Sequence, residues 1–470
     1  MHASPDTISA IATAHGRGGV GIVRVSGARA RLIAQHILGR IPAPRRVARS
    51  TFNDTDGTAI DDGISVWFEA PASFTGEDVL ELHGHGGPVV LDLLLARTVG
   101  LGARVARPGE FSERAFLNGK LDLSQAEAIA DLIDASTAAA ARGAARTLRG
   151  DFSLRIRQLV DGLVRLRSFV EGSLDFPDEE DVGAISAHQL CSELCALLDQ
   201  HESVLRSAQQ GAVLREGFSV AILGEPNVGK SSLLNRLVGT DSAIVTDIPG
   251  TTRDTVREVL NIGGVPVTVV DTAGLRRTPD PVEAIGMERS VDAGASADLV
   301  LWVVDDSAAT APVAPDVLAP GIVNWPPILW VHNKIDVSGH TESVAVDAPA
   351  LASDSTGTEC GHNGLPDATP VFVSAATGAG IDALKTFILR LAGLSDPVEG
   401  LFLARRRHLE ALDQAGVALR RAVETTRESS AIELAADDMR IAQRALSEIT
   451  GQFTSDDLLG EIFASFCIGK

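Results

Sequence analysis

The residues GEPNVGKS, from Gly224 to Ser231, have the types and spacing of a phosphate-binding loop, G-x-x-x-x-G-K-[ST]. The glycines of such a loop let backbone N–H groups turn toward an anion. Lys230 can then reach the β- and γ-phosphates of a nucleotide, and the Ser231 hydroxyl can bind Mg²⁺. The sequence therefore predicts a nucleotide site whose loop contributes Asn227, Val228, Gly229, Lys230, Ser231 and Ser232.

Three later motifs predict that the nucleotide carries guanine. The motif DTAG, which comprises Asp271, Thr272, Ala273 and Gly274, ends a strand-like run, where an acidic contact to Mg²⁺ and an N–H that senses the γ-phosphate belong. In NKID, which contains Asn333, Lys334 and Asp336, the aspartate can accept hydrogen bonds from the ring N–H and the exocyclic amine of guanine. Adenine lacks that amine. The motif SAA, at Ser374, Ala375 and Ala376, can place a backbone N–H near the guanine oxygen, and together the motifs predict a GTPase domain.

The segment TDIPGTTRD, from Thr246 to Asp254, is typical of a switch in which Thr252 can reach Mg²⁺. Leu275 follows DTAG, where Ras has the glutamine that orients the attacking water. Another group must therefore position the water and offset the charge of the transition state. The candidates are Arg253, Arg276, Glu283 and Asn227. The carboxamide oxygen of Asn227 could hold a K⁺ ion, which would occupy the place of an arginine finger.

Composition restricts the class of protein. The chain has 470 residues, enough for two to four domains, and a net charge of −21. This charge argues against a general nucleic-acid binder, so an RNA role would need a local basic patch. The candidate patches are Ala404 to His408 (ARRRH) and the helical arginines Arg142, Arg146 and Arg149. No membrane-spanning run or signal peptide is visible, and four scattered cysteines suit a reducing cytoplasm.

The elements that must position these residues change in type along the chain. The runs GVGIVRVSG, GISVWFEA, VLELHGHGG and ARVARPGEF are typical of strands, with one helix at PVVLDLLLARTVGLG. Long helices follow from Leu121. Strand-like runs then alternate with helices from Gly217 to about Gly393, as in a doubly wound parallel sheet, before helices return. The polar stretch from Ser338 to Pro370 is expected to be a surface loop.

The sequence thus predicts a multidomain protein with an α+β N-terminal domain, a split α-helical domain and an inserted α/β P-loop GTPase domain. The expected boundaries are 1–119 for the N-terminal domain, 120–215 for the first helical part, 216–393 for the GTPase domain, and 394–470 for the second helical part and tail.

The chain also resembles a known family, the tRNA uridine-modifying GTPases called MnmE or TrmE. The resemblance rests on runs spread over nearly the whole length, including GRGGVGIVRVSG, SFTGEDVLELHGHGG, ARPGEFSERAFLNGKLDLSQAEAIADLIDA, DFPDEE, FLARRRH, LSEITGQFTSDDLLGEIF and SFCIGK. It implies a homodimer formed through N-terminal folate-binding domains. It further implies that the protein works with an FAD-dependent partner (MnmG, also called GidA). The two would add an aminomethyl or carboxymethylaminomethyl group to the 5-carbon of the wobble uridine of certain tRNAs, with a tetrahydrofolate as the one-carbon donor.

The resemblance assigns residues as well. Asn227 and the backbone of Thr246, Asp247, Ile248, Pro249, Gly250 and Thr251 would hold K⁺, while Ser231 and Thr252 would hold Mg²⁺. Glu283 would orient the hydrolytic water. The positions that match the family's folate site are Arg24, Glu81, Lys120 and Lys470.

The tail SFCIGK leaves the role of Cys467 open. Small GTPases carry a prenyl group on a cysteine fourth from the end, but Gly469 and Lys470 do not fit that pattern. We instead expect the tail to reach the N-terminal domain, where Lys470 would meet a folate. Cys467 is then either a nucleophile near the transferred carbon or a packed, inert thiol.

The main alternative is a GTPase that acts as a binding switch, in ribosome assembly or regulation. Such proteins commonly append an RNA-binding module such as a KH fold with its G-x-x-G loop. This sequence has split helical flanks and a β-rich N-terminus in its place. A dynamin-like membrane GTPase fits the helices but would need a basic amphipathic or apolar segment, which the sequence lacks.

Overall fold

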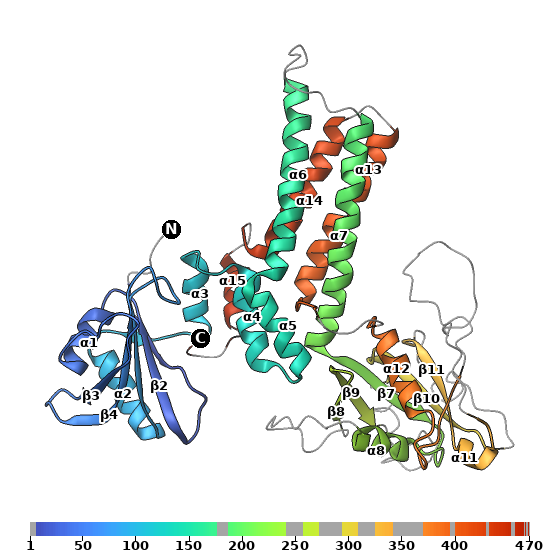
Figure 1. Ribbon diagram of the computed structural model, residues 1–470, viewed down its shortest axis with the longest axis horizontal. Coiled ribbons are helices and arrows are strands. Elements are labelled where there is room, and N and C mark those ends of the chain that lie inside the picture. The colour runs from blue at the N-terminus through green and yellow to red at the C-terminus, as the bar shows by residue number, and fades with distance from the viewer. Residues whose placement is uncertain are drawn as a thin grey trace. The chain divides into compact units, whose positions relative to one another are not determined.

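The computed structural model describes residues 6–175, 187–240, 257–271, 294–308, 325–341, 370–394, 400–428, 432–452 and 456–464, together with Phe466 and Gly469. The chain forms two compact units (Figure 1). One unit consists of Met1–Ile133, Thr147–Glu202 and Glu410–Lys470, and the other of Asp134–Arg146 and Ser203–Leu409. The fold class expected from the sequence is confirmed. The four boundaries given above stay a prediction.

The N-terminal part of the first unit contains a six-stranded sheet. Its spatial order is β3 (Ala48–Asn53), β4 (Ala59–Phe68), β5 (Val79–Gly86), β2 (Gly18–Ser26), β1 (Ile8–Ile11) and β6 (Arg104–Val105). Neighbours are antiparallel except β1 and β6, which are parallel. The helices α1 (Ala30–Leu38) and α2 (Pro88–Gly100) pack against this sheet, and α3 (Glu110–Leu117) follows it along the chain.

Two expectations for this region were wrong. The sequence predicted one helix, but α1 is a second, because its apolar residues at spacings of three and four bury one face; they are Ala30, Ile33, Ala34 and Ile37. The run ARVARPGEF was expected to be a strand throughout, yet only Arg104–Val105 pairs. Pro108 has no N–H to donate to a ladder, and Gly109, with φ of 67°, turns the chain into α3.

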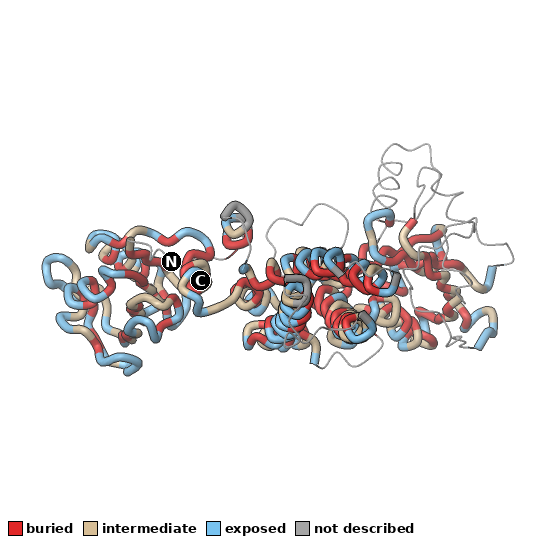
Figure 2. The backbone as a smooth tube through the Cα atoms, turned by 90° about the horizontal axis from the view of Figure 1, so that it is seen from above, coloured by how far each residue is buried: buried red, intermediate tan, exposed pale blue. Residues whose placement is uncertain are grey.

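The helices α4 (Leu123–Asp134), α6 (Asp151–Asp175), α14 (Ile432–Thr450) and α15 (Asp456–Ala464) belong to the first unit. The helix α4 begins with a capping box: Asp122 accepts the Gln125 N–H, and the Gln125 side chain accepts the Asp122 N–H, both at 3.0 Å. The helix α6 packs against α14. Figure 2 shows that buried and exposed residues alternate along the helical turns of the chain. The buried side chains of α6 and α14 include Leu159, Leu163, Leu166, Met439, Ala442 and Leu446.

Three helices have residues assigned to each of the two units: α5 (Ala138–Arg149), α7 (Ala187–Glu216) and α13 (Arg406–Glu428). The alanine-rich run after Leu121 was expected to be helical, and it forms two helices, α4 and α5. The Thr137 hydroxyl caps the second of these by accepting the Ala140 N–H at 3.1 Å. Within the part of the chain that the structure describes, no helix is long and apolar enough to cross a membrane.

The second unit contains another six-stranded sheet. Its order is β12 (Val371–Phe372), β11 (Ile328–Asn333), β10 (Leu299–Asp305), β7 (Phe218–Gly224), β9 (Val265–Asp271) and β8 (Arg257–Ile262). All neighbours are parallel except β8 and β9. The helices of this unit include α8 (Lys230–Thr240), α11 (Ile335–Ser338) and α12 (Ile381–Leu391).

The parallel core of this sheet was predicted, but two details differ. The antiparallel strand β8 was not expected. PVFVSA pairs as a strand only at Val371–Phe372, because its last residues form the loop described below. The expected surface loop falls mostly on residues 342–369, which lie outside the described residues.

Candidate guanine-nucleotide site and N-terminal site

The strand β7 delivers the phosphate-binding loop to one edge of the parallel sheet, and α8 begins where the loop ends. Gly224 has φ of 143°, and a Cβ there would lie 2.2 Å from the carbonyl oxygen of Val303. Asn227 and Gly229 also have positive φ, 65° and 95°. Only glycine fits at the first position, and the three left-handed turns give the loop its tight curvature.

The Lys230 side chain lies inside its own loop and is only 7% exposed. Its ammonium donates hydrogen bonds to the carbonyl oxygens of Gly224 at 3.1 Å and Glu225 at 2.8 Å. These are neutral acceptors, and phosphate oxygens would be stronger ones for the same cation. The loop thus presents a buried positive charge where a phosphate group would lie.

Asn333 binds the phosphate-binding loop to the neighbouring loop around residue 375, and Lys334 binds it to the end of β10. The Asn333 amide donates to the carbonyl oxygen of Val228 at 2.8 Å, and its oxygen accepts the Ala375 N–H at 3.0 Å. Lys334 donates to the carbonyl oxygen of Asn227 at 2.8 Å and to the Asp305 carboxylate at 2.6 Å. Asn333 therefore fixes the two loops relative to each other.

Asp305, at the end of β10, was not among the predicted site residues. Burial opposes its ionisation, but hydrogen bonds from Lys334 and Ser307 outweigh burial and hold its pKa below the usual range. The strand-end sequence LWVVDD was the available signal, because side chains after parallel strands gather at one sheet edge.

Asp336 is exposed and positioned by one neighbour. The Ser374 hydroxyl donates to its Oδ1 at 2.6 Å, and the Thr377 N–H in turn donates to Ser374 Oγ at 3.1 Å. This contact orients the carboxylate while its exposure leaves it accessible to a base. The recognition of guanine by Asp336 stays a prediction.

Arg236 on α8 is a further residue that the sequence did not reveal. It binds the same loop around residue 375 that Asn333 binds. Its Nε donates to the carbonyl oxygen of Ala375 at 3.0 Å, and its Nη2 donates to that of Ala376. The Ala375 N–H already binds Asn333, whereas the N–H of Ala376 makes no hydrogen bond within the described part of the chain. Arg236 lies 139 residues from Ala375, so only the fold could reveal the contact.

Other predicted site residues fall outside the described residues. These are Thr246, Asp247, Ile248, Pro249, Gly250, Thr251, Thr252, Arg253, Thr272, Ala273, Gly274, Arg276, Glu283, Cys467 and Lys470. Asp271 is described only as the last residue of β9.

A second group of predicted residues lies on the N-terminal sheet. Arg24 on β2 and Glu81 on β5 are directly paired, with both Nε and Nη2 of the arginine 2.9 Å from Glu81 Oε1. The other oxygen of Glu81 lies 3.0 Å from His83 Nε2. The Arg24 guanidinium lies 5.9 Å and 5.6 Å from the ring centroids of Phe74 and Phe111. The pair therefore combines charge, hydrogen-bonding groups and aromatic rings, which suits a flat polar heterocycle.

The C-terminal tail reaches the same place. Arg24 Nη1 donates to the carbonyl oxygen of Gly469 at 3.3 Å. Gly469 is buried with φ of 95°, and a Cβ there would lie 2.4 Å from the carbonyl oxygen of Ile11. Lys120 donates to the carbonyl oxygen of Pro71 at 3.0 Å, in the loop that also carries Phe74. Three of the four positions that match the folate site are thus described, and Arg24 and Glu81 are in direct contact.

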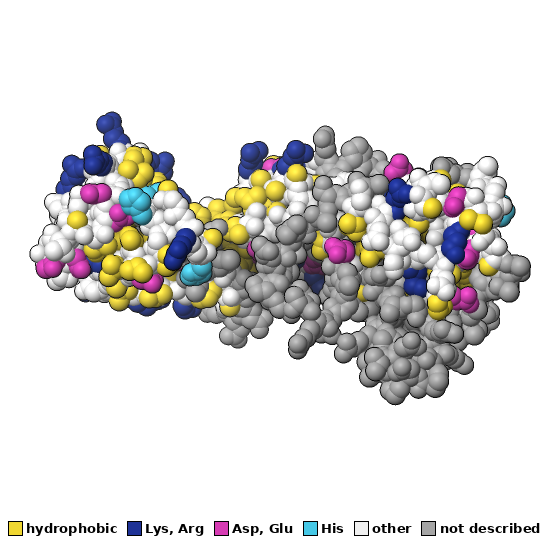
Figure 3. Space-filling view, turned by 90° about the horizontal axis from the view of Figure 1, so that it is seen from below, with side chains coloured by type: hydrophobic (Ala, Val, Ile, Leu, Met, Phe, Trp, Pro, Cys, Tyr) yellow, Lys and Arg dark blue, Asp and Glu magenta, His cyan; other side chains and the backbone are white. Residues whose placement is uncertain are grey.

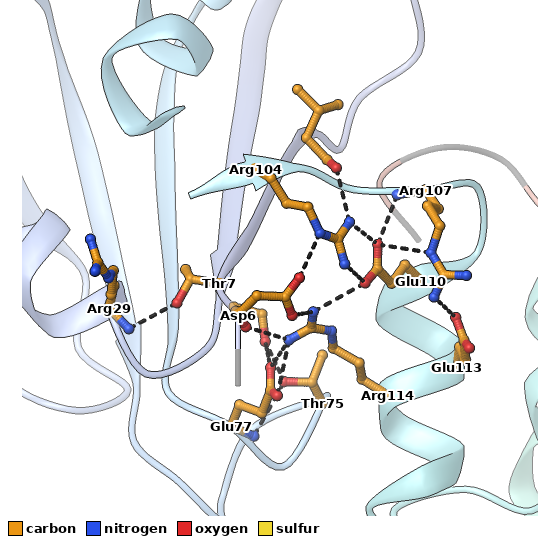
Figure 4. Close-up of polar contacts among 12 residues, drawn as sticks. Asp6, Thr7, Arg29, Thr75, Glu77, Arg104, Arg107, Glu110, Glu113 and Arg114 are labelled. Carbon is orange, nitrogen blue, oxygen red and sulfur yellow. Dashed lines mark hydrogen bonds and ion pairs between the residues drawn. The ribbon is translucent and has the colours of Figure 1, made fainter. Parts of the chain in front are cut away.

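A buried network of charges supports this end of the sheet (Figure 4). Arg114 on α3, with its side chain 4% exposed, binds Asp6, Glu77 and Glu110 at 2.8 to 3.1 Å. Arg104 also binds Glu110. Burial opposes ionisation of Glu110, but Arg104, the Arg107 N–H and Arg114 lower its pKa to about 2. Glu77 also accepts from the Ser26 hydroxyl at 2.7 Å, so the network connects α3 to the end of β2.

The comparisons with known proteins match the whole chain. A family model described as the MnmE helical domain matches residues 123–467, and one described as the GTP-binding protein TrmE N-terminus matches residues 7–120. Proteins from Thiobacillus denitrificans, Chromohalobacter salexigens and Methylococcus capsulatus, each named tRNA modification GTPase MnmE, are 52%, 53% and 52% identical to this chain. Each alignment covers 99% of this chain and 98%, 98% and 99% of the respective relative. The chain therefore belongs to the MnmE/TrmE family of tRNA modification GTPases.

Proposed function

We propose that this protein hydrolyses GTP to drive modification of tRNA. With an FAD-dependent partner, it adds an aminomethyl or carboxymethylaminomethyl group to the 5-carbon of the wobble uridine, using a one-carbon unit from a tetrahydrofolate. The observation that carries the proposal is that Asn333 connects the phosphate-binding loop to the loop at Ser374–Ala376, here called the base-recognition loop, while Lys334 binds the phosphate-binding loop to Asp305.

In this proposal the base is read by two groups. Asp336, oriented by Ser374, accepts the ring N–H and the amine of guanine. The N–H of Ala376 donates to the 6-oxygen, because the Ala375 N–H is already bound to Asn333. Lys230 and the backbone N–H groups from Asn227 to Ser232 bind the phosphates.

Metal ions and the attacking water are assigned to residues of the phosphate-binding loop and the switches. Ser231 and Thr252 hold Mg²⁺, with Asp271 behind them. Asn227, Thr246, Ile248 and Thr251 hold K⁺, and Glu283 orients the water, assisted by Arg253 or Arg276. The left-handed conformation of Asn227 and the hydrogen bond from Lys334 to its carbonyl give it a fixed backbone, which fits a residue that presents a side-chain ligand.

The K⁺ assignment predicts that GTP hydrolysis is much faster in K⁺ than in Na⁺. Equal rates of hydrolysis in the two salts would contradict it.

The tetrahydrofolate is assigned to Arg24, Glu81, Lys120 and Lys470. The paired Arg24 and Glu81 can bind acceptor and donor groups of a pterin, and the nearby Phe74 and Phe111 rings suit its flat ring system. The hydrogen bond from Arg24 to Gly469 supports the assignment of the adjacent Lys470, and we propose Cys467 as a candidate nucleophile. The folate supplies the carbon that is transferred, and these residues bind and orient it.

We further propose that two copies of this cytoplasmic protein form a homodimer, which binds the FAD-dependent partner as a heterotetramer. The four segments 1–119, 120–215, 216–393 and 394–470 are proposed as its domains.

Nucleoside analysis of tRNA tests the proposed function. A strain that lacks the gene should contain unmodified uridine at the wobble position of the affected tRNAs, and the wild-type gene should restore the modification. A strain with normal wobble uridines would exclude the proposal and favour a binding-switch GTPase.

A further inference from the structure

The positive charge of this acidic protein is concentrated near its N-terminus. Residues 7–53 contain eight of the 41 basic residues and no Lys, Asp or Glu; they are Arg17, Arg24, Arg29, Arg31, Arg40, Arg45, Arg46 and Arg49. The rest of the chain has 33 basic residues (41 minus 8) against 62 acidic residues, a balance of −29. A segment of charge +8 thus lies within a protein of net charge −21.

Four of these arginines form one exposed surface. Arg40, Arg45, Arg46 and Arg49, here called the arginine surface, lie in the ten residues that lead from α1 into β3, and all four are exposed. Arg40 Nη2 donates to the backbone carbonyl oxygen of Arg49 at 3.3 Å, so the Arg40 guanidinium lies beside the start of β3. Arg45 donates to the carbonyl oxygen of Ala72 at 2.7 Å. Lys and Arg side chains gather along one edge of this part of the protein (left end of Figure 3).

The arginine surface has no carboxylate partner within the described residues. Nearby Arg31 shows the contrast, since it binds Glu69 at 2.8 Å and Asp78 at 3.7 Å. Asp62 lies diagonally across the β3–β4 hairpin from Arg49, which pairs with Ile64. Its carboxylate accepts a hydrogen bond from Thr51 at 2.5 Å and forms no ion pair with Arg49 within the described residues. Like charges held together repel one another, and an anionic partner relieves that repulsion.

We propose that the arginine surface binds the phosphate backbone of tRNA. The four guanidinium groups are spread over an exposed segment, which suits a polyanion with repeated phosphates better than one small anion. Each can bind a phosphate through two parallel N–H groups. The inference rests on the proposed function, because tRNA is the polyanion that this family modifies. It adds a third basic patch to those at residues 142–149 and 404–408 that the sequence indicated.

Binding of unmodified tRNA transcript to the full-length protein at several KCl concentrations tests the inference. The variant R40Q/R46Q/R49Q removes three charges. It keeps Arg31, which pairs with Glu69 and Asp78, and Arg45, which binds the carbonyl group of Ala72 in a different loop. The matched control is R421Q/R440Q/R444Q, three exposed arginines that each pair with a carboxylate on α14. We expect the first variant to lower the slope of log affinity against log salt concentration by about 2 and affinity by about 10- to 100-fold. The control should change both little.

The outcomes separate this inference from the function on which it rests. Equal affinity and slope in the two variants would overturn it, as would wild-type protein that binds no tRNA at low salt. A variant with normal tRNA binding but weakened association with an acidic protein would also overturn it. None of these results would contradict the proposed function. That function is tested separately, by whether the wild-type gene restores modified wobble uridine to a strain that lacks it. GTP hydrolysis without tRNA should be the same in all three proteins.

Discussion

We assign recognition of guanine to a few single residues, and a substitution of Arg236 tests this assignment most clearly. It binds two successive carbonyl groups of the base-recognition loop, and so fixes the N–H that we assign to the 6-oxygen. We predict that Arg236→Ala weakens GDP binding about 10-fold, from the loss of charged hydrogen bonds. The affinity for 2-aminopurine riboside diphosphate, which lacks the 6-oxygen, should not change.

Fluorescence titration with the two nucleotides gives this comparison. Asn235→Ala, an exposed neighbour on the same helix, is the control and should bind both nucleotides like the wild type. Equal weakening for both nucleotides would mean that Arg236 stabilises the domain and has no particular connection to the 6-oxygen.

Glu283 is the residue to which we assign the water. We predict that Glu283→Ala leaves GTP affinity nearly intact and lowers turnover about 100-fold or more. The reason is that the variant lacks the group that orients the attacking water or accepts its proton. Single-turnover hydrolysis checks this. Glu283→Gln separates the two roles, because an amide can orient water but cannot accept its proton. Unchanged turnover in the alanine variant would make Glu283 a surface carboxylate.

Among the secondary-structure elements, α3 depends most on buried charge. The lowered pKa of Glu110 means that its carboxylate stabilises the fold fully above pH 4.5, and this contribution, up to about 3 kcal/mol, is lost as the pH falls toward 2. Glu110→Gln should therefore lower the free energy of unfolding at pH 7 by about 3 to 5 kcal/mol, since Arg114 remains buried. Urea unfolding from pH 7 to pH 3 measures both effects.

The matched control is Glu113→Gln, whose carboxylate pairs with the exposed Arg107 and should contribute less than about 1 kcal/mol. If Glu110→Gln lost no more stability than this control, or if its loss did not shrink toward pH 3, the buried network would not stabilise α3.

The C-terminal tail is the element that we connect to folate. Deletion of Ile468 to Lys470 should abolish binding of 5-formyltetrahydrofolate, because Lys470 and the carbonyl group of Gly469 beside Arg24 are removed. K⁺-stimulated GTP hydrolysis should remain, since none of the residues assigned to the nucleotide belongs to the tail. Isothermal titration and a phosphate-release assay measure the two activities.

Two glycines offer a finer comparison. Gly469→Ala places a Cβ against the Ile11 carbonyl and should weaken folate binding, whereas Gly460→Ala on α15 has open space and should not. Normal folate binding in the truncated protein would show that the tail is only the end of the chain.

At the scale of the whole molecule, the sequence predicted the features that depend on particular residue types at fixed local spacing. The loop from Gly224 to Ser231 and the NKID motif require particular residue types at fixed spacing, so a nucleotide site could be predicted from the sequence without the fold. The helix α1 was missed because nine residues between two strands give a weak periodic signal. The contacts of Arg236 with Ala375 and of Arg24 with Phe111 join residues far apart in the chain, and no local pattern reveals them.

The central claim is that hydrolysis of GTP, whose guanine is recognised by Asp336, drives tRNA modification. Asp336→Asn offers the base an amide in place of a carboxylate, which suits the 2-oxygen of xanthine and not the 2-amine of guanine. GTP affinity should fall about 100-fold or more while XTP becomes a substrate. Wobble-uridine modification, reconstituted with the FAD-dependent partner, folate and tRNA, should then proceed with XTP and not with GTP. Modification by the variant at the wild-type rate with GTP, or without any nucleotide, would contradict the account.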